Sequence, residues 1–373
     1  MAASTTAVLA AADNGSKKIF LRIGLQENTS NASIGCEGDY KAVDSESKIV
    51  SAFSGRNISS IHAVKNSITI GNKIFGSSVE LAPVKENDRL SVNGKRYRGS
   101  ISIISKNTGK ITVINKIGIE EYLYGVLPME VSYEWSIEAL KAQAVVSRTY
   151  AMKSMGKYED KGYDLSATFL SQVYGGMNCE NPNTSKAVDQ TKGEVITFKG
   201  QLISSVFHST CGGFTENVGN VWENNNSAPE YMEGVCCPYC KKSPQYNWEC
   251  VIEKEIIREN LEKKGYHLGK IDSIRVAGRA PFSRRAITFN VYHSGGKVSI
   301  SSNEFRMAVG SGQIRSTLLN LKNYRDKIKF VGRGWGHGVG LCQWGAKGMA
   351  DKGYGYMYII NKYFPRTKII KQL

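Results

Sequence analysis

Residues 117–155 decide the fold of this chain and read IGIEEYLYGVLPMEVSYEWSIEALKAQAVVSRTYAMKSM. Proline removes a backbone donor and disfavours helix at the residue before it. The chain is therefore predicted to be extended after Pro128, with Glu130 on a turn. Ser136 is suited to cap the next helix, with Glu138 in its first turn, where negative charge is favoured. The stretch predicts a turn with one carboxylate, followed by a long helix.

The predicted helix is amphipathic. Its apolar residues recur at helical spacing and predict one buried face: Ile137, Leu140, Ala144, Ala151 and Met155. Lys141 and Arg148 are about two turns apart on a different face. A carboxylate ahead of two aligned cations is suited to an anionic or sugar substrate. The structural alternative is a solvated Glu130 and an ordinary surface pair between Glu138 and Lys141.

The same residues fit a longer pattern, E-x-Y-L-x-G-V followed by a glutamate and W-x-x-E-A-L-K-A-Q-A-V-x-x-R-T-Y-A. The matching positions are Glu120, Tyr122, Leu123, Gly125, Val126, Glu130, Trp135, Glu138, Ala139, Leu140, Lys141, Ala142, Gln143, Ala144, Arg148, Thr149 and Tyr150. This pattern resembles the signature of the SpoIID/LytB family, whose namesake is stage II sporulation protein D. Val131 and Ser132 replace the usual Met-Pro, and Ser136 replaces a frequent proline. The resemblance covers roughly residues 110–370 well and 17–110 weakly.

The resemblance implies a peptidoglycan lytic transglycosylase. Such an enzyme cleaves the MurNAc-GlcNAc bond of glycan strands, preferably denuded ones, and leaves 1,6-anhydro-MurNAc ends. Most glycosidases need two carboxylates. Here the C6 hydroxyl of muramic acid is the nucleophile, so Glu130 is expected to be the single general acid/base. Its apolar neighbours would raise its pKa by desolvation. Lys141 and Arg148 are assigned to the anionic lactyl group.

Two other functions fit the resemblance. LytB-type relatives imply a non-catalytic, wall-binding activator of an N-acetylmuramoyl-L-alanine amidase, in which Glu130 is structural. A purely structural wall protein would bind peptidoglycan without turnover. The expected partners are therefore glycan strands and a wall amidase.

Composition narrows the setting of the protein. The chain has 373 residues, a net charge of +16 and 41% hydrophobic residues, which suit a folded protein that attracts polyanions. No nucleic-acid-binding motif occurs in a fitting context, so nucleic acid is not an expected partner. No segment has the length of apolar sequence needed to span a bilayer. The resemblance implies an extracytoplasmic protein of a Gram-positive, spore-forming bacterium. Membrane association is expected only through an N-terminal anchor that the given sequence does not include.

The chain is predicted to divide into three parts. Residues 1–16 resemble the end of a secretory leader or are disordered. Residues 17–112 alternate as strands do and contain Asn93-Gly94, a type I′ hairpin signal. Residues 113–373 form the SpoIID-like domain. The expected fold class is α+β, a sheet-rich scaffold with the long helix and two subdomains around a groove.

Three further residues are candidates for substrate binding. Tyr174, in a Q-x-Y-x-G element, suits a sugar-stacking ring, a phenolic donor or a core aromatic with a satisfied hydroxyl. Tyr231 lies in a stretch that matches a P-Y-L element of the family. His337 lies in GRGWGHGVG, where glycines predict a tight loop that approaches a ligand closely. It is suited to donate to a substrate oxygen, to hold Glu130, or to serve as a structural histidine.

Cysteine and histidine residues gather between positions 208 and 240. His208-x-x-Cys211 and Cys237-x-x-Cys240 have spacers that let two side chains converge on one metal. They predict a structural zinc ion that is not required for the chemistry, because a four-ligand site leaves no open position. Cys236 competes with Cys237 as a ligand. A disulfide or free thiols are the alternatives, and Cys342 has no partner spacing that can be interpreted.

Overall fold

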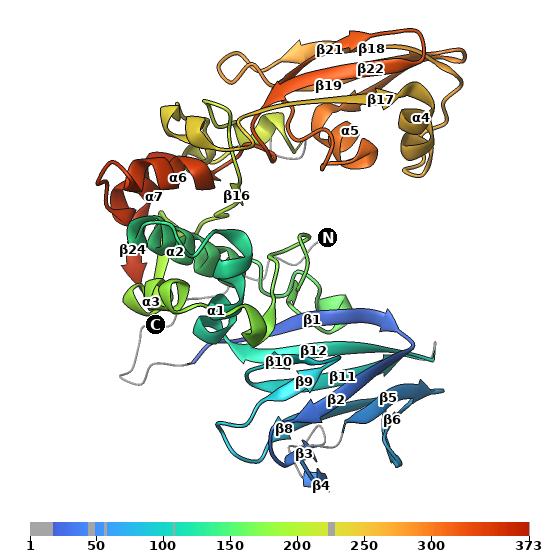
Figure 1. Ribbon diagram of the computed structural model, residues 1–373, viewed down its shortest axis with the longest axis vertical. Coiled ribbons are helices and arrows are strands. Elements are labelled where there is room, and N and C mark those ends of the chain that lie inside the picture. Colours follow the sequence, from blue (N-terminus) through green and yellow to red (C-terminus); the bar gives the residue numbers. More distant parts are fainter. Residues whose placement is uncertain (1–17, 44–48, 56–57, 107–108, 223–227, 373) are drawn as a thin grey trace.

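The computed structural model describes residues 18–43, 49–55, 58–106, 109–222 and 228–372. The predicted leader, residues 1–16, lies outside the described residues. The fold is α+β, as predicted, with helices and several separate sheets. Figure 1 shows three bodies along the long axis of the molecule. They are an N-terminal body (18–118), a central body (119–246 and 334–372) and an insert body (247–333).

The N-terminal body consists of two sheets, and the first is completed by the short strand β13 from residues 119–246. The first has the order β13-β1-β12-β11-β8-β3-β4 and the second β10-β9-β2-β5-β6-β7. Their bounds are β1 Phe20–Thr29, β2 Asn31–Cys36, β3 Tyr40–Val43, β4 Ile49–Phe53, β5 Ser59–Val64, β6 Ser67–Ile70, β7 Lys73–Phe75, β8 Ser78–Pro83, β9 Leu90–Val92, β10 Lys95–Tyr97, β11 Ser100–Lys106, β12 Lys110–Gly118 and β13 Leu165–Ser166. Leu21 and Ile23 are fully buried on alternate positions of β1, as period-two alternation requires.

The hairpin at Asn93-Gly94 is confirmed. Strands β9 and β10 pair antiparallel around it. Both turn residues have positive φ, 49° for Asn93 and 78° for Gly94, which is the type I′ geometry. This hairpin contributes an edge strand to the second sheet.

The central body carries most of the helices. Its helices are α1 Ile119–Glu130, α2 Ile137–Lys153, α3 Pro182–Gln190, α6 Gln343–Ala350 and α7 Tyr356–Tyr363. Short 3-10 segments are η1 Glu159–Lys161, η2 Gly176–Cys179, η3 Val218–Asn220, η4 Glu230–Met232 and η5 Pro238–Lys242. Its strands are β14 Glu194–Phe198, β15 Gln201–Leu202, β16 Phe207–His208, β23 Leu341–Cys342 and β24 Lys368–Lys371. Within the described residues, no helix is long and apolar enough to cross a membrane.

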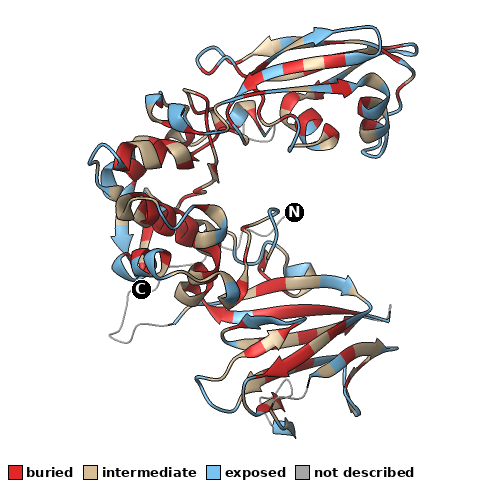
Figure 2. Cartoon of the chain, viewed as in Figure 1, coloured by how far each residue is buried: buried red, intermediate tan, exposed pale blue. Residues whose placement is uncertain are grey.

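Helix α2 is buried on nearly all sides, so the predicted single buried face is wrong. Leu140 and Ala144 pack into the core shared with the N-terminal body. Val145 and Val146 pack on the other side, into the core of the central body. Figure 2 shows α2 as a largely buried helix. Met155 lies beyond the end of the helix and is exposed.

The approach to α2 also differs from the prediction. Pro128 is inside α1, and Glu130 is the last helical residue instead of a turn residue. Proline costs the helix a hydrogen bond. The last turn is nevertheless closed by Val131 N–H, which donates to the Leu127 carbonyl at 3.0 Å. Ser136 precedes α2 as expected, but its side chain makes no capping hydrogen bond.

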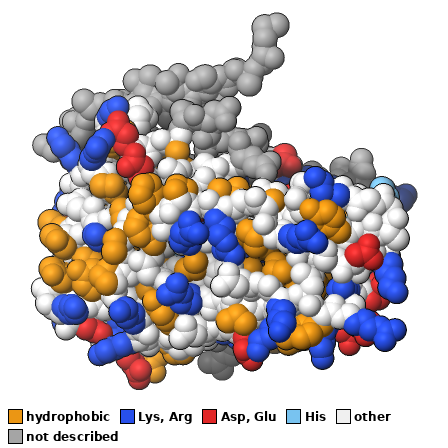
Figure 3. Space-filling view, turned by 90° about the horizontal axis from the view of Figure 1, so that it is seen from above, with side chains coloured by type: hydrophobic (Ala, Val, Ile, Leu, Met, Phe, Trp, Pro, Cys, Tyr) orange, Lys and Arg blue, Asp and Glu red, His pale blue; other side chains and the backbone are white. Residues whose placement is uncertain are grey.

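The sequence predicted residues 113–373 as one domain and did not distinguish the insert body within it. It contains β17 Asn247–Glu253, α4 Lys254–Glu262, β18 Ile271–Arg279, β19 Ala286–His293, β20 Gly296–Ser301, α5 Ser302–Val309, β21 Leu319–Asn323 and β22 Lys327–Arg333. Phe289, Phe305 and Phe330 belong to its own hydrophobic core. The chain enters and leaves through one antiparallel pair, with Asn247 opposite Arg333. Seen from above, the molecule presents lysine and arginine side chains scattered among apolar ones (Figure 3).

Candidate active site

Helix α1 ends at a pocket of about 620 Å³, and Glu130 is part of its wall. The end of α2 and four segments distant in sequence supply the rest. The lining residues are Glu130, Tyr150, Lys153, Ser154, Lys157, Phe169, Leu170, Ser171, Val173, Ser204, Val206, Phe207, Trp222 and His337. The pocket therefore brings together two of the predicted site residues, Glu130 and His337.

The Glu130 carboxylate is half-buried and receives one backbone hydrogen bond. Val173 N–H donates to Oε1 at 3.0 Å, and Gln343 Nε2 donates to the Glu130 carbonyl at 3.3 Å. Burial raises the pKa of Glu130 above its ordinary value of 4.5, while the hydrogen bonds from Val173 and Gln343 oppose this rise. Among the described residues, no cation forms a salt bridge with Glu130. Segments distant in sequence share the pocket wall with Glu130, and the adjacent Met129 is exposed.

This environment suits a group that both gives and takes a proton. The raised pKa keeps a larger fraction of the carboxyl protonated near neutral pH, which a general acid requires. Once the proton has left, Val173 N–H stabilises the carboxylate. One side chain can therefore serve as acid and base in turn.

His337 lies in the pocket wall but has no free ring nitrogen. Nδ1 accepts from Val339 N–H at 3.1 Å, and Nε2 lies 2.9 Å from the Phe207 carbonyl, to which it donates in the neutral tautomer. Burial lowers the pKa of His337 to about 3, so the ring is neutral near pH 7. The Trp222 ring lies 5.1 Å from the imidazole ring. Of the roles predicted for it, the geometry matches the structural one.

Neither Lys141 nor Arg148 lines the pocket. Arg148 is fully buried and binds Glu120 through two nitrogens, with Nη2 at 2.6 Å from the carboxylate. It also donates to the carbonyls of Val188 and Glu194. Lys141 pairs with Glu138 at 2.9 Å, the surface pair weighed above as the alternative. A guanidinium with no exposed surface cannot contact a lactyl group, so the role assigned to Arg148 is wrong.

Tyr174 and Tyr231 are also core residues. Tyr174 is buried between Tyr97 and Tyr122, and its hydroxyl donates to Asn115 Oδ1 at 2.9 Å. The Tyr231 hydroxyl is 3.2 Å from the Ser204 N–H, from which it accepts. Neither ring has a free face for a sugar, because both are more than nine-tenths buried. The stacking role predicted for Tyr174 is wrong, and the core role given as its alternative is the observed one. Tyr231, a candidate without an assigned role, does not line the Glu130 pocket.

The residues that the sequence missed lie at the C-terminal end of α2 and just beyond it. Lys153 and Lys157 place two cations in the pocket wall. Phe169 and Leu170 are exposed apolar residues on the same wall, 75% and 57% accessible. Exposed apolar side chains beside lysines suit a sugar with a carboxylate. Phe169 and Leu170 stand just before the Q-x-Y-x-G element. That element was the one feature of the sequence that could have pointed to this part of the pocket wall.

Three of the four predicted metal ligands lie together in the structure, and Cys342 takes the place predicted for His208. Cys211, Cys237 and Cys240 cluster with Cys342, and their four sulfur atoms all lie within 4.8 Å of one another. His208 is outside this set. Its Nδ1 lies 3.0 Å from the Val339 carbonyl, and its buried Nε2 has no hydrogen-bond partner among the described residues. The adjacent Cys236 is exposed, and Cys237 is the buried member of that pair.

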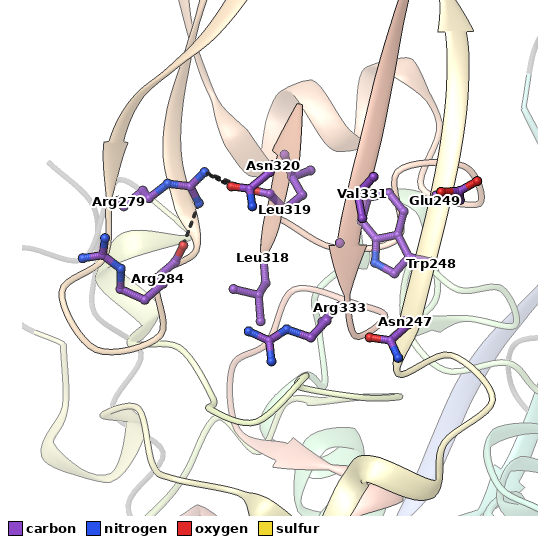
Figure 4. Close-up of a pocket in the computed structure, with 11 residues that line it drawn as sticks. Asn247, Trp248, Glu249, Arg279, Arg284, Leu318, Leu319, Asn320, Val331 and Arg333 are labelled. Atoms are coloured by element: carbon purple, nitrogen blue, oxygen red, sulfur yellow. Dashed lines mark hydrogen bonds between the residues drawn. The ribbon is translucent and has the colours of Figure 1, made fainter. Parts of the chain in front are cut away.

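A second pocket, of about 760 Å³, lies in the insert body and contains none of the predicted site residues. Figure 4 shows Arg279 and Arg284 on one side of it, Trp248 on the other, and Arg333 between them, near Asn247. Arg279 donates to the Leu319 and Arg284 carbonyls and to Asn320 Oδ1, so its charge has only neutral partners there. This pocket has no carboxylate suited to acid catalysis, since Glu249 pairs with Lys329 at 2.8 Å.

Comparison with known proteins places these features in a wider group. Residues 107–198 match a family described as Stage II sporulation protein, and residues 239–340 match a domain of unknown function. The chain is 33% identical to an uncharacterized protein of Brachyspira hyodysenteriae, over 94% of the chain and 92% of the relative. It is 30% identical to Stage II sporulation protein D of Bacillus subtilis, over 80% of the chain and 88% of the relative.

A further relative carries a different name. The amidase enhancer of Bacillus subtilis is 30% identical over 80% of the chain, and the chain spans about half of that protein, 47% of its length.

Proposed function

Because the chain belongs to the stage II sporulation protein D family, we propose that it is a peptidoglycan lytic transglycosylase acting outside the cytoplasmic membrane. Its substrate is the glycan strand, preferably without stem peptides, and Glu130 is the single general acid/base. The observation that carries this proposal is the half-buried Glu130 in an open pocket, its pKa raised by burial and without a salt-bridge partner in the described residues.

The reaction begins with a proton transfer from Glu130 to the glycosidic oxygen between MurNAc and GlcNAc. The bond from C1 of MurNAc to that oxygen breaks, and the C6 hydroxyl oxygen of the same sugar forms a new bond to C1. Glu130, now a carboxylate that accepts from Val173 N–H, takes the proton of the C6 hydroxyl. The products are a 1,6-anhydro-MurNAc end and a free GlcNAc hydroxyl, and no water is consumed.

Lys153 and Lys157 take the binding role that the sequence had assigned to Lys141 and Arg148. Both line the pocket with Glu130, and either ammonium suits the lactyl carboxylate of muramic acid. Neither is among the groups that lower the pKa of Glu130. The pocket thus supplies cations for the substrate without forcing its acid to ionise.

The test is the incubation of denuded glycan strands with the wild-type protein and two variants. Mass spectrometry measures the anhydro-muramic ends. Glu130→Gln keeps the size of the side chain but removes the acid, and we expect it to lower the rate by at least 100-fold. Glu134→Gln is the matched control, because Glu134 is exposed and outside the pocket. Equal, near-zero product from all three proteins would refute the proposal.

The alternative function is activation of a wall amidase without cleavage of glycan. The similarity to an amidase enhancer favours it. An amidase assay on intact peptidoglycan, with and without this protein, distinguishes the two. If wild type and Glu130→Gln stimulate the amidase equally and neither yields anhydro ends, the protein is an activator and Glu130 is structural.

A further inference from the structure

Four cysteines from three separate segments form one buried cluster in the central body. Cys211 follows β16, Cys237 and Cys240 flank the start of η5, and Cys342 ends β23. All four are fully buried. We propose that Cys211, Cys237, Cys240 and Cys342 bind one zinc ion, which holds the wall of the Glu130 pocket in place.

The spacing of the sulfur atoms fits a metal better than disulfides. All eight cysteines are free, and the Cys211 and Cys240 sulfurs are 3.5 Å apart, well beyond a covalent S–S bond of about 2.05 Å. Zinc binds thiolate at about 2.3 Å, so two sulfurs of a tetrahedral site lie about 3.8 Å apart. The observed spacing, 3.5 Å for that pair and no more than 4.8 Å for any pair, brackets this value.

The surroundings of the cluster favour thiolates. Cys342 Sγ accepts from the backbone N–H of Cys211 at 3.2 Å and of Gly345 at 3.3 Å. Cys211 Sγ accepts from Gly213 N–H at 3.4 Å. Four thiolates around Zn²⁺ carry a net charge of −2, and donors directed at sulfur stabilise such charge.

A buried cation lies beside the cluster. Arg285 is 1% exposed, and its Nη2 donates to the Cys211 carbonyl at 2.6 Å. Its Nε and Nη1 have no hydrogen-bond partner, and in the described parts of the chain it forms no salt bridge. A buried guanidinium among neutral thiols is costly. The buried Glu216 carboxylate interacts with this guanidinium electrostatically, and an anionic zinc–thiolate centre would add further compensating negative charge beside it.

The ion would act on the pocket through residues that lie next to its ligands in the chain or across a strand pair. Cys342 is followed by Gln343, whose amide donates to the Glu130 carbonyl. Strand β23 pairs in parallel with β16, so that Phe207 faces Leu341 and His208 faces Cys342. Phe207 in turn accepts the hydrogen bond from His337. Because all four positions are filled by sulfur, the site leaves no place for substrate and is structural.

The first experiment measures metal in the full-length protein purified under reducing conditions without added metal. Elemental mass spectrometry is expected to find one zinc per chain. Cys237→Ser and Cys342→Ser should each lower this occupancy at least tenfold. Cys236→Ser is the matched control, since Cys236 is the exposed neighbour of a ligand, and it should retain the zinc.

The second experiment does not depend on the variants being folded. Thiol labelling of the wild type is expected to modify the cluster only after a chelator and a denaturant are added. A protein without metal, iron in place of zinc, intramolecular disulfides among the four cysteines, or zinc retained in both ligand variants would each overturn the proposal. None of these results depends on glycan cleavage, so the metal proposal can fail or stand independently of the proposed reaction.

Discussion

Replacement of Arg148 by methionine should destabilise the protein without removing a substrate contact. Arg148 is fully buried, and its guanidinium donates to three acceptor groups: the Glu120 carboxylate and the carbonyls of Val188 and Glu194. Removing one partner of a buried ion pair costs about 3–5 kcal/mol. Because the Glu120 side chain keeps 17% exposure, we expect the lower end, about 3 kcal/mol.

Urea unfolding measures this effect. With a slope of about 2 kcal/mol per M, a loss of about 3 kcal/mol lowers the midpoint by about 1.5 M. The double variant Arg148→Met with Glu120→Gln should lose less than Arg148→Met alone, because it leaves no buried charge unpaired. Glycan cleavage per folded molecule should persist in Arg148→Met and fall in Lys153→Met. An unchanged midpoint together with lost cleavage in Arg148→Met would refute the structural role and restore the substrate-binding one.

The other predictions concern pH and one turn. Burial raises the pKa of Glu130 in the folded state above its ordinary value. Protonation of Glu130 therefore stabilises the folded protein fully below about pH 4.5, and this stabilisation is lost as the pH rises through the folded-state pKa. Glu130→Gln should therefore match wild type near pH 4 and exceed its stability at pH 8; an equal gain at both pH values contradicts this. Burial lowers the pKa of His337 from 6.5 to about 3. The stability that the neutral His337 ring gives the folded protein is therefore fully present above pH 6.5 and is lost as the pH falls toward 3. His337→Gln should flatten the acid side of the stability profile, and an unchanged slope would show that His337 is not buried in its neutral form. Gly94→Ala should cost about 1 kcal/mol from its positive φ alone, since the added carbon meets nothing within 4 Å; the same change at Gly76, which lacks positive φ, should cost less in thermal unfolding.

Sequence reasoning succeeded where the signal is local. The Asn93-Gly94 pair sets its own turn geometry, and the α2 helix follows from residues that are neighbours along the chain. The α+β class follows from such local patterns taken together. The direction in which the pKa of Glu130 shifts was also expected, since burial raises it.

Sequence reasoning failed where a partner is distant. The carboxylate that pairs with Arg148 is 28 residues away, and the hydroxyl of Tyr174 finds its acceptor 59 residues away. Cys342 joins Cys211 across 131 residues, a spacing that matches no short motif. A helix pattern gives the face of a side chain but not what packs against it, and α2 packs against two cores.

The most direct test of the central claim is the source of the oxygen at the cut end. Denuded glycan is incubated with the protein in water enriched in heavy oxygen, and the new MurNAc ends are weighed by mass spectrometry. If the C6 hydroxyl is the nucleophile and Glu130 the only acid/base, the ends are anhydro sugars without label, and Glu130→Gln makes almost none. Labelled reducing ends, or the same anhydro product from Glu130→Gln, would contradict the account.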